Sequence, residues 1–110
     1  MDLQKMREHN EALEASEEYL RIEDELEMEV ARAIVKAHIK ALKKQHDPKT
    51  RARIAELQAL AAENPLKAVD TLRGMGFCHT YWYWRKRILK RKYRMVWYTP
   101  QEIEPFTCFD

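Results

Sequence analysis

The 110-residue sequence has few of the residues that interrupt or cross-link a fold. It contains two glycines, four prolines, two cysteines and a single serine, Ser16. Two cysteines, Cys78 and Cys108, are too few for a disulfide scaffold, so a reducing cytoplasm is the expected compartment. No apolar run reaches the roughly 18 residues of a membrane-spanning helix, and the polar, acidic N-terminus does not resemble a secretory signal. We therefore expect no membrane partner.

Sequence signatures of catalysis are also absent. The chain has no glycine-rich phosphate loop, and Ser16 does not stand in a nucleophile elbow. The carboxylates are numerous but follow the spacing of a solvated helix face. His9, His38 and His46 are spread along the predicted N-terminal helix and cannot converge on one site. These features predict that the protein is not an enzyme and needs no cofactor.

One set of side chains could ligate a metal. Cys78, His79 and Cys108 would come together if the C-terminal tail folded back. Structural zinc sites normally use four ligands with paired Cys-x-x-Cys spacing, and that spacing is missing here. The sequence therefore predicts no metal site, with these three residues as weak candidates.

Charge is distributed very unevenly along the chain, although the net charge is only +2. Residues 1–30 carry a net charge of −8, residues 31–72 carry +5, residues 73–98 carry +8 with no acid, and residues 99–110 carry −3. Such a gradient favours oriented partners, because opposite ends of the molecule would attract opposite surfaces.

The pattern of apolar residues predicts a single, mainly α domain over residues 1–110. Residues 1–46 contain no proline or glycine and repeat apolar residues at helical spacing, which predicts one long helix, bent near Asn10 to Ser16. The Asp-Pro and Asn-Pro pairs at 47–48 and 64–65 are typical helix starts and predict two shorter helices over residues 47–74. Because the connection near residue 47 is short, the first two helices should form an antiparallel hairpin.

The segment at residues 75–100 has two readings. Its sequence between 81 and 98, YWYWRKRILKRKYRMVWY, is nearly a mirror image of aromatic, basic and apolar residues. This symmetry favours a C-terminal aromatic and basic β-hairpin, which would make the fold α+β, followed by an acidic tail at 101–110. The alternative is a fourth, basic amphipathic helix, because RKRILKRK offers no residue suited to a tight turn.

The basic centre of this segment is the main candidate for binding a partner or nucleic acid. In the hairpin reading its tip is solvent-exposed, with the flanking aromatics packed as core. The candidate residues are Arg85, Lys86, Arg87, Ile88, Leu89, Lys90, Arg91, Lys92 and Arg94. The cations could neutralise phosphates, or they could pair with the acidic first helix of the same molecule. An apolar Ile88-Leu89 tip would favour a protein pocket.

A second candidate surface lies on the N-terminal helix, which is longer than the two short helices can cover. Leu3, Met6, Leu13, Tyr19 and Leu20 would then remain exposed as a docking surface.

These surfaces predict a non-enzymatic adaptor or inhibitor that docks on a larger, nucleic-acid-handling protein, a role typical of small phage or mobile-element proteins. Direct, sequence-nonspecific nucleic-acid binding through residues 85–94 is the first alternative. A structural helical oligomer, with a homodimer as its simplest form, is the second.

Overall fold

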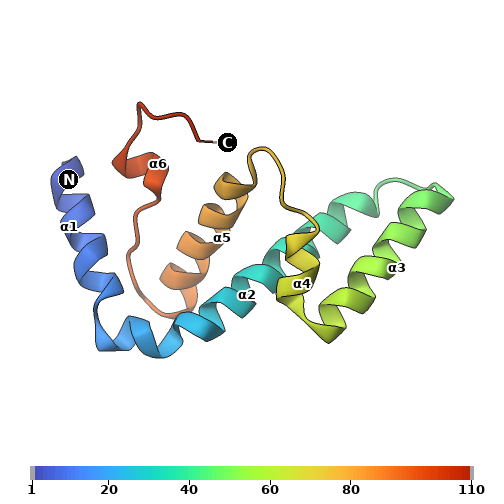
Figure 1. Ribbon diagram of the computed structural model, residues 1–110, viewed down its shortest axis with the longest axis horizontal. Helices are drawn as coiled ribbons and strands as arrows, with labels where there is room; N and C mark the ends of the chain where they lie inside the picture. Colours follow the sequence, from blue (N-terminus) through green and yellow to red (C-terminus); the bar gives the residue numbers. More distant parts are fainter. Residues whose placement is uncertain (1, 110) are drawn as a thin grey trace.

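The computed structural model describes residues 2–109, and this part of the chain is mainly helical (Figure 1). Its elements are α1 (Leu3–Glu14), α2 (Glu17–Leu42), α3 (Pro48–Glu63), α4 (Pro65–Asp70), α5 (Phe77–Lys92) and α6 (Pro100–Ile103). No strand occurs among the described residues. The prediction of a mainly α protein is thus confirmed.

The predicted C-terminal β-hairpin is wrong. Residues 77–92 form the continuous helix α5, which begins after Gly76, the one described glycine with a positive φ (79°). A hairpin would need a turn within RKRILKRK, where no glycine, asparagine, aspartate or proline occurs, whereas lysine, arginine and leucine are good helix formers. The helical alternative is correct only as far as Lys92, because residues 93–99 leave the helix and lead to α6.

The N-terminal residues form two helices rather than one. Ser16 adopts an extended conformation and caps α2, its side chain accepting a hydrogen bond from the backbone N–H of Tyr19 at 3.3 Å. The Ser16 hydroxyl also donates to the carbonyl of Leu13 at 2.6 Å, which closes the end of α1. Serine competes with the helical backbone in this way, so the predicted bend is a full break.

The predicted helical hairpin is confirmed as the pair α2 and α3, which run antiparallel in Figure 1. Asp47 and Asn64 cap α3 and α4, and Pro48 and Pro65 occupy the first helical positions, as expected. The short helix α4 packs against both α2 and α3.

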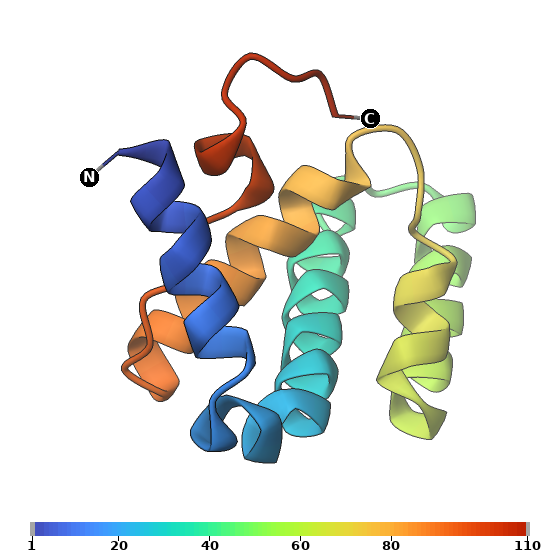
Figure 2. The ribbon, with the colours of Figure 1, turned by 60° about the vertical axis from the view of Figure 1, so that its left-hand side comes forward.

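The core lies along α2, which α5 crosses on the side away from α3 (Figure 2). The largest fully buried side chains come from three helices: Leu26 and Val30 of α2, Leu57 of α3 and Leu89 of α5. None of the helices described for residues 2–109 is both long and apolar enough to cross a bilayer.

Helix α1 is attached to this core through the extended residues after α5. The buried side chain of Asn10 pairs with the backbone of Tyr98, donating to its carbonyl at 2.7 Å and accepting from its N–H at 3.0 Å. The Trp97 indole N–H donates to Glu14 at 3.1 Å. Trp97 and the backbone of Tyr98 thus help to hold α1 in place.

Candidate functional site

Arg85, a predicted binding residue, faces the interior. It is 8% exposed and forms an ion pair with Glu27 of α2. Its guanidinium carbon lies 5.6 Å from the ring centre of Tyr19 and 5.3 Å from that of Trp97. Burial lowers the pKa of Arg85, but an arginine stays charged at neutral pH. Arg85 is thus a structural cation that joins α5 to the acidic half of α2.

Lys86 and Lys92 are also paired within the molecule. Lys86 hydrogen-bonds Glu102 of α6, and Lys92 lies 2.8 Å from Glu29 and 3.2 Å from Glu25 of α2. Burial alone would raise the pKa of Glu29, but the hydrogen bonds from Lys92 and Tyr93 outweigh it and lower this pKa.

The same hydrogen bond shifts the pKa of Tyr93 in the opposite direction. Burial, together with its hydrogen bond to Glu29, raises the pKa of Tyr93 to about 12.

The ion pairs of Arg85 with Glu27 and of Lys92 with Glu25 and Glu29 bear on the alternative that the basic segment pairs with the acidic N-terminal helix. That alternative is correct for these two cations.

Ile88 and Leu89 do not form an exposed tip. Leu89 is completely buried in the core, and Ile88 is half-buried against it. The reason is the helical conformation of α5, which points both side chains toward its neighbours instead of placing them at a turn.

Four cations of the segment remain without an acidic partner among the described residues: Arg87, Lys90, Arg91 and Arg94. Lys90, Arg91 and Arg94 are exposed, and Arg87 donates to the hydroxyl of Tyr83 at 3.0 Å. Arg94 adopts the left-handed conformation, with φ 59°, where the chain turns out of α5.

The proposed docking residues of the N-terminal region are divided by the structure. Tyr19 is 2% exposed, and Leu13 is half-buried against the core. Leu3 and Leu20 are exposed, and Met6 is half-buried. Leu20 lies on α2 and the other two on α1, so the break at Ser16 removes the continuous stripe expected from one long helix.

The weak metal candidates do not converge. Within residues 2–109, no three histidine, cysteine or acidic side chains are close enough together to hold an ion. Cys108 is exposed, Cys78 is half-buried, and the His79 ring contacts the carbonyl of Phe109 at 3.2 Å.

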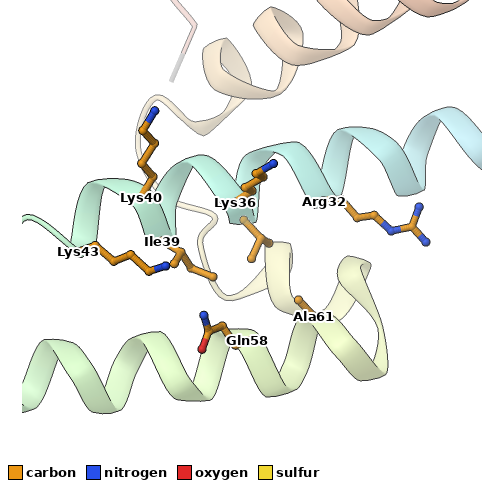
Figure 3. Close-up of a pocket in the computed structure, with 8 residues that line it drawn as sticks. Arg32, Lys36, Ile39, Lys40, Lys43, Gln58 and Ala61 are labelled. Atoms are coloured by element: carbon orange, nitrogen blue, oxygen red, sulfur yellow. The ribbon is translucent and has the colours of Figure 1, made fainter.

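The structure adds a site that the sequence analysis missed, a groove between α2 and α3. It encloses about 450 Å³ and has a floor of apolar side chains (Figure 3). Ile39 lies between the two helices in this view, and Gln58 faces it from α3. The lining residues are Arg32, Val35, Lys36, Ile39, Lys40, Lys43, Gln58 and Ala61. We call this the α2–α3 groove.

The rim of the α2–α3 groove is strongly positive. Arg32, Lys36, Lys40 and Lys43 are exposed and follow one another at intervals of three or four residues, so they form one row along α2. None of the four has an ion-pair partner within residues 2–109. The acids of α3 are engaged elsewhere, Glu56 by Arg53 and Glu63 by Lys67.

The sequence contained a signal for this groove. Residues 31–46 hold no acid, and their lysines recur with helical period beside Val35 and Ile39. An amphipathic helix that is cationic on one side and apolar on the other is typical of a binding surface. The sequence could not show that α3 would leave part of the apolar side of α2 uncovered next to these cations.

Comparisons with protein-family models, with curated protein sequences and with solved structures found no match to this chain. Its function must therefore be inferred from its own surfaces.

Proposed function

We propose that the protein is a non-enzymatic binding protein that docks on a larger protein through the α2–α3 groove and modulates it. The observation that carries the proposal is the row of four exposed cations, none paired within residues 2–109, along an apolar groove. Cations left unpaired beside apolar surface contribute little to the fold, whereas they suit an oppositely charged partner.

The partner element that fits this groove is an acidic amphipathic helix. The cations from Arg32 to Lys43 extend over about 16 Å of α2, at 1.5 Å per residue, which is three turns of a helix. Acids repeated every three or four residues on the partner would meet them. The partner's neighbouring apolar stripe would cover Val35, Ile39 and Ala61. Two antiparallel helices with an open groove between them accept a third helix by ordinary ridge-into-groove packing.

A defined peptide tests this proposal without knowledge of the natural partner. The probe is a labelled helical peptide with glutamates on one face and leucines on the adjacent face, titrated with the full chain and followed by fluorescence anisotropy. We expect saturable binding that weakens as salt rises, and K36E/K40E should weaken it by about tenfold or more. The control K5E/R91E makes the same change in net charge at two exposed cations that do not line the groove, and it should bind like the wild type.

Reversing the charges on both the peptide and the groove gives a complementary test. A peptide with lysines in place of its glutamates should bind the K36E/K40E variant better than it binds the wild type. The proposal is contradicted if a scrambled peptide of equal composition binds equally well, because the groove would then not recognise an amphipathic helix. It is also contradicted if K5E/R91E weakens binding as much as K36E/K40E does.

A further inference from the structure

The outer face of α5 carries a second positive surface, independent of the α2–α3 groove. Three cations of α5 are paired with acids of other helices, and these are Arg85, Lys86 and Lys92. Arg87, Lys90 and Arg91 have no acid partner among the described residues, and their spacing of three and four places them on one face of the helix. Tyr83 lies one turn before Arg87 on the same face.

Tyr83 is 53% exposed, which is unusual for an aromatic side chain in a domain with so few of them free of the core. Its hydroxyl accepts a hydrogen bond from Arg87 at 3.0 Å, and the guanidinium carbon of Arg87 lies 5.9 Å from its ring centre. The rings of Tyr83 and Trp84 pack edge to face, with their centres 5.2 Å apart. The Tyr83 ring is therefore held in position beside a cation while much of it faces solvent.

A cleft of about 370 Å³ lies beside this face, between α5 and the residues around Thr99 and Gln101. The aromatic side chains of Trp82 and Tyr83 line it together with Arg87 and Lys90. Within residues 2–109, no carboxylate lines the cleft. The nearby Glu102 is engaged by Lys86, and its pKa is lowered because that hydrogen bond and those at Thr99 outweigh the effect of burial.

We propose that this face of α5 binds single-stranded nucleic acid. Arg87, Lys90 and Arg91 contact successive phosphates, and a base stacks on the exposed ring of Tyr83. Cations arranged around an aromatic ring are the combination that single-strand binders use, because every base has a flat face and every nucleotide a phosphate. A duplex hides its base faces, and an acidic helix would find no aliphatic groove here comparable to that between α2 and α3.

The inference does not depend on the proposed docking function, since it concerns a different helix and different cations. Binding is expected to be independent of sequence, because the one amide in the cleft, Gln101, already donates to the carbonyl of Pro105 at 3.3 Å. Stacking and phosphate contacts carry little sequence information.

The test is fluorescence anisotropy of the full chain with a labelled oligothymidylate of about a dozen nucleotides, which spans a typical single-strand site. With three phosphates neutralised, a plot of log K against log salt should have a slope of about −2. R87E/K90E should weaken binding by about tenfold or more and flatten this slope. Y83A should weaken binding by roughly tenfold with the slope unchanged, as expected for loss of stacking, while Y83F binds like the wild type.

The groove variant K36E/K40E serves as the matched control, because it changes the net charge by the same amount on another surface. The proposal is overturned if K36E/K40E weakens oligonucleotide binding as much as R87E/K90E, since binding would then reflect overall charge. It is likewise overturned if Y83A binds like the wild type or if a duplex of equal length binds as tightly. Tighter binding to phosphatidylserine vesicles than to the oligonucleotide would assign the face to a membrane surface instead.

Discussion

Arg85 illustrates how a cation in a basic segment can serve the interior of the protein. Its charge is matched by Glu27, and its flat guanidinium lies near the rings of Tyr19, Tyr81 and Trp97. Arginine suits such a position better than lysine because its planar, weakly hydrated group can pair with a carboxylate and stack on aromatic rings together. The residue links three parts of the fold, namely α2, α5 and the segment after α5.

We therefore predict that R85A lowers the free energy of unfolding by about 3 kcal/mol, as expected for breaking a largely buried ion pair. R85K should have a smaller effect, because it keeps the charge but loses the stacking. Urea denaturation followed by circular dichroism measures both. The exposed, unpaired Arg91 supplies the control, and R91A should stay within about 0.5 kcal/mol of the wild type. Equal stability of R85A and R91A would contradict the structural role of Arg85.

A second prediction concerns acid pH and Glu29. The folded pKa of Glu29 lies below its ordinary value of 4.5, so the unfolded state binds the proton more tightly. Its contribution to stability is therefore present above the unfolded pKa and is lost as pH falls through the folded pKa. In urea denaturation from pH 7 to about pH 3, the wild type should be more stable than E29Q at neutral pH. The difference in the free energy of unfolding between the wild type and E29Q should shrink below pH 4.5. If the stability difference between the two proteins did not depend on pH, the charge of the Glu29 carboxylate would not contribute to stability.

At the scale of elements, the break between α1 and α2 determines what the N-terminal residues can do. Ser16 ends one helix and caps the next, which turns α1 back toward the extended residues 96–98. The side chains of His9 and Asn10 then reach the backbone of Val96 and Tyr98. A continuous helix would carry both residues away from that segment.

Replacement of Ser16 tests this element. S16A removes the N-cap and should lower the free energy of unfolding by about 1 kcal/mol, whereas S16D can still accept the hydrogen bond from Tyr19 and should retain most of the stability. Thermal unfolding of the two variants beside the wild type gives the comparison. If S16A were as stable as the wild type, the cap would not define the start of α2.

The elements also show what could be predicted from the sequence and what could not. The starts of α3 and α4 were predictable because Asp47-Pro48 and Asn64-Pro65 act locally through capping and a fixed φ. The conformation of residues 77–92 was not, because the aromatic residues favour strands and the central residues favour helices, and tertiary packing decided between them. Leu89 is fully buried only because α5 crosses α2, a contact that no local pattern encodes.

The candidate sites were predictable only in part for a related reason. Cation positions can be read from the sequence, but their partners depend on which helices meet. Lys92 and Lys90 are similar in sequence context, yet Lys92 reaches Glu25 and Glu29, whereas Lys90 has no acidic partner within residues 2–109. Whether a cation is used in an internal ion pair or is left free to bind a partner therefore depends on which helix packs against it.

At the scale of the whole molecule, the fold neutralises part of the charge gradient of the chain. The acidic half of α2 is paired with cations of α5 through Glu25, Glu27 and Glu29. Within residues 2–109, the cations along the rim of the α2–α3 groove and on the outer face of α5 have no acidic partners. A small protein that leaves both of these surfaces open is suited to bridge an acidic protein segment and a polyanion.

The docking role of the α2–α3 groove is the central claim, and amide chemical-shift mapping tests it most directly. The ¹⁵N-labelled full chain is titrated with the acidic amphipathic peptide, and the shifted amides are placed on the structure. We predict that the shifts concentrate in residues 32–43 of α2 and residues 54–61 of α3, with α5 unaffected. Shifts confined to α5, or no shifts at saturating peptide, would contradict the claim.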